Sequence, residues 1–360
     1  MRNLSHAELE ELGREIDRID ADLRATLGAR DRRYIERVIR TQRLLAVAGR
    51  VGIYASLPLL PTGAPFFVAL GASSLALGVA KILENMEIGH NVLHGQWDWM
   101  NDPAIHSSTW EWDTVCPADQ WKHSHNVVHH TWTNVIGKDH DVGYQIMRVS
   151  DRQPWRPSYV LQPIYNLLLA GLFEWGVAVH DIDADALRAG TLTMADVRPL
   201  AAGIARKATK QVLKDYVLWP LLAGPFFLWV LAANALANAI RNVWAYAIIF
   251  CGHFPDGAHV FTEREIEGET RGAWCLRQIL GSCNIEGGPL FHLMSGNLSH
   301  QIEHHLFPDL ASNRYAEASV RVKALCERHG IPYNSGSLAR QLGTTLRTIV
   351  RLSLPTEVPA

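Results

Sequence analysis

Two long stretches of the chain are mostly apolar and carry no charged residue. The first runs from Val51 to Ala80, a length of 30 positions, and the second from Tyr216 to Ile240, a length of 25 positions. An α-helix needs about 20 consecutive apolar residues to cross the hydrocarbon core of a bilayer. Both stretches reach that length, so the pattern predicts an integral membrane protein with polar regions outside the bilayer.

Each apolar stretch contains a signal for a turn. The segment LPLLPTGAP, residues 57–65, has three prolines and one glycine, which indicate a turn between two helices. The second stretch continues to Phe254, and we place its turn at NALAN, residues 234–238. The pattern therefore predicts an all-α fold with four transmembrane helices arranged as two hairpins. The predicted helices span roughly residues 44–60, 66–83, 216–233 and 237–253.

Two further segments are expected to form helices outside the bilayer core. Ser158 to Phe173 is only about 16 residues long and is interrupted by Pro163, so we expect an amphipathic helix at the membrane interface. Ser312 to Gly330 has the pattern of an amphipathic helix that stops at its glycine. We expect this second helix to pack across the histidine-rich region of the protein.

Basic residues precede each predicted hairpin, whereas the hairpin tips are nearly uncharged. The positive-inside rule then places the bases of both hairpins and both chain termini in the cytoplasm. Arg50 lies inside the first predicted helix, so its side chain must reach the interface or face protein. The basic residues are Arg30, Arg32, Arg33, Arg37, Arg40 and Arg43 before the first hairpin, and Arg206, Lys207, Lys210 and Lys214 before the second.

The predicted hairpins divide the chain into six regions. Residues 1–43 form a cytoplasmic N-terminal helical segment, 44–83 the first hairpin, and 84–215 a cytoplasmic lobe that includes the interfacial helix. Residues 216–254 form the second hairpin, 255–335 a further part of the cytoplasmic helical lobe, and 336–360 a C-terminal tail.

Charge and cysteine content exclude some classes of protein. The formal net charge of −2 provides no broad basic field, so we expect no nucleic-acid partner. The five cysteines include no CxxC pair, so neither a disulfide framework nor an iron–sulfur site is indicated.

Histidine is the most informative residue type, with 17 copies in the chain. Three segments contain histidines at i, i+4 spacing, which places both rings on one face of a helix. In two of them another histidine follows directly, and such a set can offer ligands to two nearby metal ions. A single zinc site needs about four ligands, so eight or more imidazoles favour a dinuclear site, although imidazole suits iron, copper and zinc alike. The pairs are His90/His94, His125/His129 and His300/His304, with His130 and His305 following the last two pairs and His253 closing the fourth predicted helix.

Other histidines have simpler interpretations. We expect His6, His180 and His329 to be solvated or helix-capping side chains. We interpret the remaining five as hydrogen-bonding or surface residues, namely His106, His123, His140, His259 and His292.

The histidine motifs resemble those of a known family. HNVLH, HNVVHH and QIEHH, in this order and with two hairpins before and between them, resemble the three histidine boxes of the membrane fatty acyl desaturases. The wider contexts WKHSHNVVHHTWTNVIGKDHDVGY and SGNLSHQIEHHLFPDLASNRY are similar to boxes of bacterial acyl-CoA and acyl-lipid desaturases. The similarity runs from about Leu44 to Ser335. It implies a non-haem di-iron centre that uses O2 to remove two hydrogens from an acyl chain and form a cis double bond.

The resemblance also assigns roles to individual residues. Gln301 fits the start of the third box, whereas His300 has no fixed role in the family pattern although its spacing from His304 would suit a ligand. Asn91 stands where the family commonly has Asp. The implied iron ligands are His90, His94, His125, His129, His130, His253, His304 and His305. The acidic neighbours expected to orient these rings are Glu87, Asp139, Asp141 and Glu303.

The leading hypothesis is therefore a fatty acyl desaturase of a bacterial cell membrane, with the histidine boxes on the cytoplasmic side. Its substrate would be an acyl-CoA or an acyl-lipid. The chain has no HPGG haem signature of a fused cytochrome b5, so the resemblance implies an external electron donor, either a ferredoxin or a flavin/iron–sulfur reductase. We interpret the tryptophans between residues 97 and 132 mainly as an interfacial belt, with the wall of an acyl tunnel as the alternative.

Two other functions remain open at this stage. A membrane di-iron hydroxylase acting on fatty acyl chains or alkanes would use the same kind of site but insert oxygen. A non-enzymatic membrane metal-binding or transport protein would also collect histidines, but it would be expected to place them near the bilayer midplane rather than beyond the helix ends.

Overall fold

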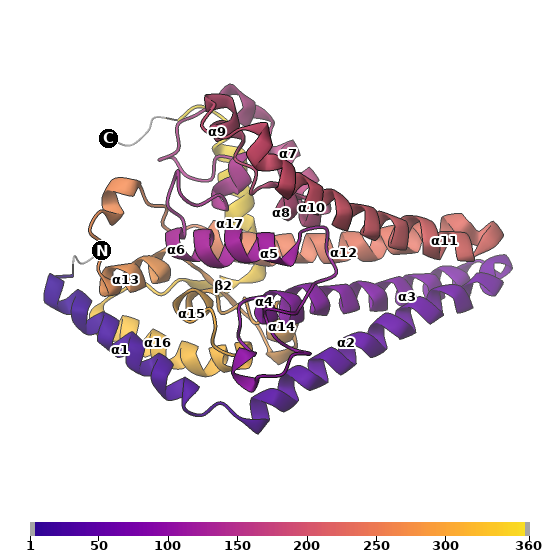
Figure 1. The fold of residues 1–360 in the computed structure, drawn as a ribbon, viewed down its shortest axis with the longest axis horizontal. Coiled ribbons are helices and arrows are strands. Elements are labelled where there is room, and N and C mark those ends of the chain that lie inside the picture. Colours follow the sequence, from indigo (N-terminus) through magenta and orange to yellow (C-terminus); the bar gives the residue numbers. More distant parts are fainter. Residues whose placement is uncertain (1–3, 357–360) are drawn as a thin grey trace.

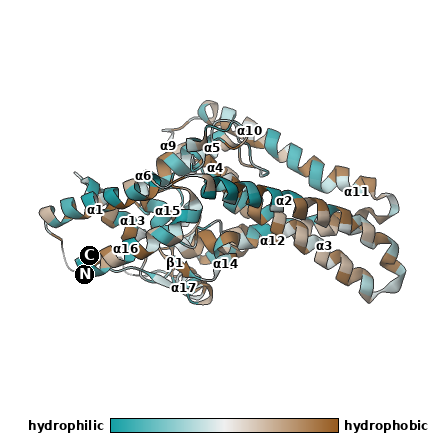
Figure 2. Ribbon diagram, turned by 90° about the horizontal axis from the view of Figure 1, so that it is seen from below, coloured by the Kyte–Doolittle hydropathy of each residue, from teal (hydrophilic) through white to brown (hydrophobic). Residues whose placement is uncertain are grey.

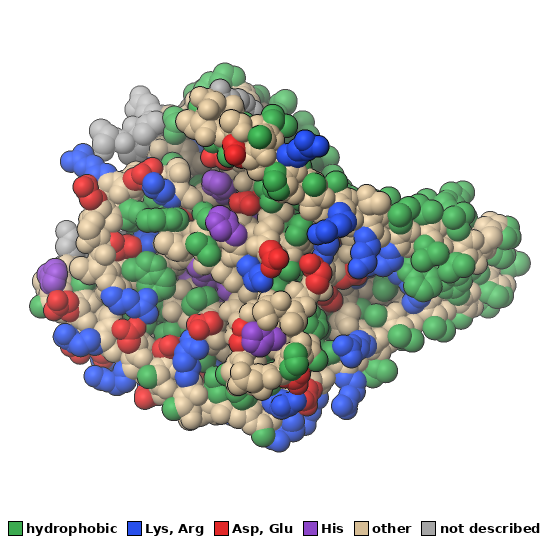
Figure 3. All heavy atoms as spheres, in the orientation of Figure 1, with side chains coloured by type: hydrophobic (Ala, Val, Ile, Leu, Met, Phe, Trp, Pro, Cys, Tyr) green, Lys and Arg blue, Asp and Glu red, His purple; other side chains and the backbone are tan. Residues whose placement is uncertain are grey.

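The computed structural model describes residues 4–356, apart from the side chains of residues 184, 185 and 188. A lobe of short helices and loops contains both ends of the chain, and long helices extend from one side of it (Figure 1). They form two arms: α2 (Ala29–Ser56) and α3 (Ala64–Ile82) make the first, and α12 (Phe227–His253) makes the second together with α10 (Met194–Val212) and α11 (Trp219–Leu222). The extended part is the more hydrophobic, and charged side chains gather over the lobe (Figures 2 and 3).

The remaining helices build the lobe, apart from α10 and α11, which belong to the second arm. The helices are α1 (His6–Arg24), α4 (Asn91–Leu93), α5 (Ala118–Trp121), α6 (His130–Trp132), α7 (Gln162–Gly171), α8 (Phe173–Val179), α9 (Ala184–Ala189), α10 (Met194–Val212), α11 (Trp219–Leu222), α13 (Arg271–Gly281), α14 (Pro289–Met294), α15 (Gln301–Leu306), α16 (Tyr315–His329) and α17 (Leu338–Arg351). Two short strands, β1 (Asn284–Glu286) and β2 (Ser335–Ser337), pair in parallel.

Within residues 4–356, three helical segments are long and apolar enough to cross a membrane. These segments are Ala29–Thr62, Ala64–Leu93 and Gly224–His253. A mainly helical protein with several membrane-spanning candidates was predicted, and the structure confirms that general architecture.

The first hairpin has its turn where the sequence predicted it. After α2 a short 3₁₀ turn, Leu57–Thr62, leads to Gly63 at φ 70°, a backbone conformation that glycine adopts without steric cost. The two helices then pack closely, because a Cβ atom on Gly49 would lie only 2.6 Å from the backbone nitrogen of Leu77. Small residues permit such close approach between membrane helices.

The predicted turn of the second hairpin is wrong. Helix α12 is continuous through NALAN, and the turn lies earlier, at Gly224 (φ 55°) and the proline that follows it. Asn234 and Asn238 are buried side chains on α12 that donate hydrogen bonds to the Asp215 backbone carbonyl (2.6 Å) and the Tyr216 hydroxyl (2.8 Å). The asparagines therefore form hydrogen bonds across a helix-packing interface, and the Gly-Pro pair forms the turn.

A buried ion-pair network joins the two arms. Lys81 Nζ lies 2.7 Å from Asp215 Oδ2, and an Arg50 guanidinium nitrogen lies 3.7 Å from the other carboxylate oxygen. Arg50 also donates to Asn234 Oδ1 (2.5 Å), and its guanidinium lies 4.6 Å from the centre of the Trp219 ring. Arg50 thus faces protein, which was one of the two arrangements expected for it.

The lobe contains two differences from the expected helices. Pro163 lies in the first turn of α7 and begins this helix rather than interrupting it. Residues 336–360 were predicted to form a tail, but helix α17 lies within them and packs against α12 and α7. The amphipathic helix expected before Gly330 is confirmed as α16, which ends at that glycine with φ 66°.

Candidate metal centre

The histidines lie on short helical turns at the base of the long helices. His90 ends a π-helical turn, Leu83–His90, that continues α3, and His125 and His129 lie on a second π-helical turn, Lys122–His129. A π-helix is wider than an α-helix and is frequent at functional sites. The wider turn lets residues at i, i+4 and i+5 face the same region, so His130 also points inward.

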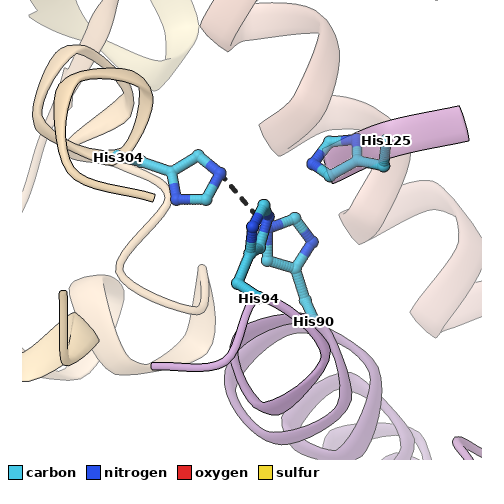
Figure 4. Close-up of side chains that lie close together, drawn as sticks. All are labelled: His90, His94, His125 and His304. Atoms are coloured by element: carbon cyan, nitrogen blue, oxygen red, sulfur yellow. Dashed lines mark hydrogen bonds between the residues drawn. The ribbon is translucent and has the colours of Figure 1, made fainter. Parts of the chain in front are cut away.

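Four imidazoles form a first group. One ring nitrogen from each lies within 4.8 Å of the others, and all four side chains are buried. The Nε2 atoms of His90 and His304 are 3.4 Å apart, and the rings converge from different elements (Figure 4). The members of this group are His90, His94, His125 and His304.

A second group lies directly beside the first. Ring nitrogens of His129, His253 and His305 are within 4.8 Å of one another. The His130 ring lies between the groups, with its centre 4.8 Å from that of His304 and 4.5 Å from that of His305. All eight histidines expected to bind metal are therefore brought together.

Hydrogen bonds on the outer side of three rings fix which nitrogen faces inward. His129 Nδ1 donates to Asp139 (3.0 Å), and His305 Nδ1 donates to Gln278 Oε1 (3.2 Å). The Tyr315 hydroxyl donates to a backbone carbonyl, so it accepts from His304 Nδ1 at 3.2 Å. In each case the other ring nitrogen, Nε2, faces the cluster, where the coordinating nitrogen of a metal-binding histidine is needed. Sequence reasoning gave no signal for Gln278 or Tyr315.

The acidic neighbours divide into two kinds. Asp139 contacts a ring of the second group, whereas Glu87 and Glu303 form their described hydrogen bonds with other residues. Glu87 accepts from Tyr34, Ser312 and Asn297, and Glu303 accepts from Asn284 and Tyr333. The expectation that these two glutamates orient the histidine rings is therefore not supported by their contacts.

The third histidine box contains two further residues of interest. The side-chain amide nitrogen of Gln301 lies 3.0 Å from His253 Nε2, at the edge of the second group. His300 stacks on His292 with ring centres 4.5 Å apart. It belongs to neither group, despite its i, i+4 spacing from His304.

The donor set fits metal ions. His94, His125 and His129 each have a buried Nε2 with no hydrogen-bond partner, and both nitrogens of His130 lack one. Burying unpaired polar atoms is costly unless something binds them. Burial and neighbouring histidines hold the pKa of His94, His130, His304 and His305 well below 6.5, so these rings are neutral, as metal ligands must be.

His129 is the exception among these rings. Burial lowers its pKa, but Asp139 and Asp141 raise it to about 9. Two carboxylates beside one buried imidazole favour positive charge there, which a metal ion supplies as well as a proton does.

A narrow cavity approaches the first group of histidines. Together with the space at its opening to solvent it has about 630 Å³ of empty volume, and its lining includes His90 and His125 of the first group and Asn242 and Ala245 of α12. Trp121 stacks on His125 with ring centres 4.4 Å apart and also lines the cavity, as does Trp112. These two tryptophans therefore match the tunnel-wall alternative rather than the interfacial belt.

Comparison with known proteins agrees with this geometry. The family model described as "Fatty acid desaturase" matches residues 64–337. The chain belongs to the fatty acid desaturase family. It is an enzyme, an oxidoreductase of lipid metabolism, and the metal-transport hypothesis is set aside.

Several relatives are desaturases from different organisms. An NADPH-dependent stearoyl-CoA 9-desaturase of Mycobacterium tuberculosis (strain H37Rv) is 49% identical over 357 residues, which cover 98% of this chain and 82% of the relative. An sn-1 linoleoyl-lipid 6-desaturase of Synechocystis is 25% identical over 276 residues, covering 73% of this chain and 74% of the relative. An acyl-lipid (7-3)-desaturase of Rebecca salina is 28% identical over 237 residues, covering 64% and 53%.

Proposed function

We propose that this desaturase holds two iron ions and uses O2 to introduce a cis double bond into a saturated fatty acyl-CoA. The observation that carries the proposal is the pair of adjacent, buried histidine groups, in which the Nε2 atoms of His94, His125, His129 and His130 have no hydrogen-bond partner. An unactivated C–H bond has no acidity for a general base to use, and iron with O2 and electrons supplies the oxidant that breaks it. The protein supplies position, neutral ligands and exclusion of water.

Each group supplies ligands to one ion in this proposal. His90, His94, His125 and His304 would hold the first ion, and His129, His253 and His305 would hold the second. His130 lies between them, so it is assigned to the pair without choosing one ion. Asp139, Gln278 and Tyr315 hold three of the rings in the required tautomer.

The nature of the substrate follows from the relatives rather than from the site. The mycobacterial relative at 49% identity is named for stearoyl-CoA, for position 9 and for NADPH. We therefore propose stearoyl-CoA, desaturation between carbons 9 and 10, and a separate reductase that takes its electrons from NADPH.

Product analysis tests this function. Expression in a host that lacks the activity, with stearate supplied, should give an 18-carbon monounsaturated acid with its double bond at carbon 9 and no added oxygen. A hydroxylated product would instead identify a hydroxylase of the same site type.

The proposed topology has four membrane crossings. Three are the apolar segments Ala29–Thr62, Ala64–Leu93 and Gly224–His253, and α10 with α11 forms the other. In this topology both hairpin tips lie on the outer side of the cell membrane, and the histidines and both termini lie on the cytoplasmic side. Single cysteines at Thr62 and Ala223 should react with a membrane-impermeant maleimide in intact cells, whereas one at Glu10 should not. The five native cysteines are buried, so they contribute little background. Equal labelling of all three sites, or labelling of Glu10→Cys alone, would contradict this topology.

The cavity predicts a determinant of chain length. Ala245 lines it eight residues before His253, about 12 Å along α12. Replacing Ala245 by phenylalanine should fill part of the cavity and shift the palmitoyl-to-stearoyl ratio of activity roughly 10-fold toward the shorter chain. Competition between the two acyl-CoAs measures this ratio.

Val243 provides the matched control on the same helix. Its side chain is 51% exposed and does not line the cavity. Val243→Phe should leave the ratio unchanged. An unchanged ratio in Ala245→Phe, with stearoyl activity retained, would show that the acyl chain lies elsewhere.

A further inference from the structure

His180 is a buried histidine that the sequence gave no reason to connect with the metal centre. It follows the last residue of α8, and its side chain is only 7% exposed. Its Nδ1 donates to the Val177 carbonyl (2.8 Å), and its Nε2 lies 2.8 Å from Asp141 Oδ1. The ring is therefore held at both nitrogens. His180 is the C-cap residue of α8, so the capping alternative is confirmed, but its side chain is buried rather than solvated.

Asp141, the partner of His180, lies beside one ring of each histidine group. Its other oxygen, Oδ2, is 3.5 Å from His129 Nδ1 and 3.8 Å from His125 Nδ1. His125 belongs to the first group and His129 to the second. The position of this one carboxylate thus affects a ring in each group, and His180 fixes that position from the opposite side.

The backbone next to Asp141 is strained, and His180 also contacts this strained segment. Gly143, Tyr144 and Gln145 are consecutive residues with positive φ, at 63°, 52° and 59°. The left-handed conformation costs roughly 1–2 kcal/mol for each non-glycine residue, so surrounding contacts must maintain it. The Gln145 side-chain amide donates to the His180 backbone carbonyl (2.5 Å), and the Tyr144 ring centre lies 5.0 Å from that of His180.

His180 also lines the cavity that reaches the first histidine group. The helix pair that leads to it, α7 and α8, exposes large apolar side chains, with Leu167 72% and Leu168 57% exposed. His180 therefore lies between the exposed apolar pair α7 and α8 and the Asp141 carboxylate, which contacts His125 and His129.

We propose that His180 is a positioning residue of the metal centre. Through Asp141 it orients His125 and His129, and through Gln145 it holds the strained turn that places Tyr144 in the cavity. This inference rests on the proposed function only for the identity of the metal as iron. The contact with Asp141 would orient the same rings around any metal ion that binds there.

Two variants at this position separate positioning from simple packing. His180→Leu keeps the side chain large but removes both ring hydrogen bonds, whereas His180→Gln keeps a donor that reaches Asp141. His180→Leu should weaken metal binding or lower kcat by about 10–100-fold, a range typical for residues that orient metal ligands. His180→Gln should restore at least part of that loss.

The measurement combines metal binding with turnover. Apo-protein is titrated with Co²⁺, whose visible absorption reports ligand geometry, and kcat and KM are measured separately on iron-loaded enzyme. His140→Gln is the control, because His140 precedes Asp141 in the chain but its ring is paired with Asp181 and Asp183, each at 3.9 Å, rather than with Asp141. The control should bind Co²⁺ and turn over as the unmodified protein does.

Each possible outcome decides the proposal. A changed Co²⁺ spectrum in His180→Leu that His180→Gln restores supports it. Unchanged spectra, affinity and kcat in His180→Leu overturn it, and so does an equal loss of thermal stability in both variants with normal Co²⁺ binding. If the unmodified protein binds two Co²⁺ ions but desaturates nothing, the proposed function fails while this inference is still tested by the spectra.

Discussion

Replacing either His304 or His305 by alanine is expected to abolish desaturation. The two residues are adjacent on α15 and fully buried, and each contributes a ring to a different histidine group. Loss of a residue that only orients a ligand typically costs 10–100-fold, so loss of a ligand itself should cost at least ~100-fold. Gas chromatography of the acyl products, together with the iron content of purified protein, measures both effects.

His300→Ala is the control for this pair of variants. His300 lies four residues before His304 in the same segment, but its ring stacks on His292 and belongs to neither histidine group. The variant should retain its iron and stay within a few-fold of the unmodified activity. A His300→Ala protein that has lost iron while His304→Ala keeps it would show that the ligands are assigned incorrectly.

Replacing Asp215 by leucine is expected to cause the largest loss of stability. Its carboxylate is 3% exposed and neutralises Lys81, at 9%, and Arg50, at 15%. Removing one partner leaves buried charge without compensation, which costs roughly 3–5 kcal/mol. A loss of that size should lower the midpoint of thermal unfolding in detergent by roughly 10 °C.

The control for Asp215 is an exposed ion pair. Asp17 and Arg271 join α1 to α13 at 2.9 Å, but both side chains are about half exposed. Asp17→Leu should lower the free energy of unfolding by only about 0–1 kcal/mol.

A Lys81→Met/Asp215→Leu double variant gives a second check. Its loss of unfolding free energy should be smaller than the sum of the two single losses, because one unpaired charge is removed as well. Equal midpoints for Asp215→Leu and the unmodified protein would contradict a stabilising role for this network.

The first hairpin could be predicted because its turn uses residues that act locally. Three prolines and Gly63 determine the backbone of the turn without help from the rest of the chain. The second turn was misplaced because asparagine has two common uses. Asn234 and Asn238 resemble turn residues in sequence, but they satisfy Asp215 and Tyr216 across a helix interface that sequence periodicity does not show.

The metal-binding histidines were found for a different reason. Imidazoles at i, i+4 spacing share a helix face, so the motifs indicated candidate ligands, but they included His300, and the resemblance to the desaturases selected the eight rings that converge. The residues that orient them come from distant segments, because Gln278 lies on α13 and Tyr315 on α16. His180 was missed because its role depends on Asp141, 39 residues away, and no local pattern marks that pair.

The central claim is that distant segments hold two iron ions with nitrogen ligands in a single buried cluster. Its most direct test is metal analysis of purified, active enzyme, combined with Mössbauer spectroscopy on protein grown with ⁵⁷Fe. We expect about two iron ions per chain, in nitrogen-rich and mutually coupled environments, in proportion to activity. Full activity with one iron ion per chain, or with none, would contradict the claim.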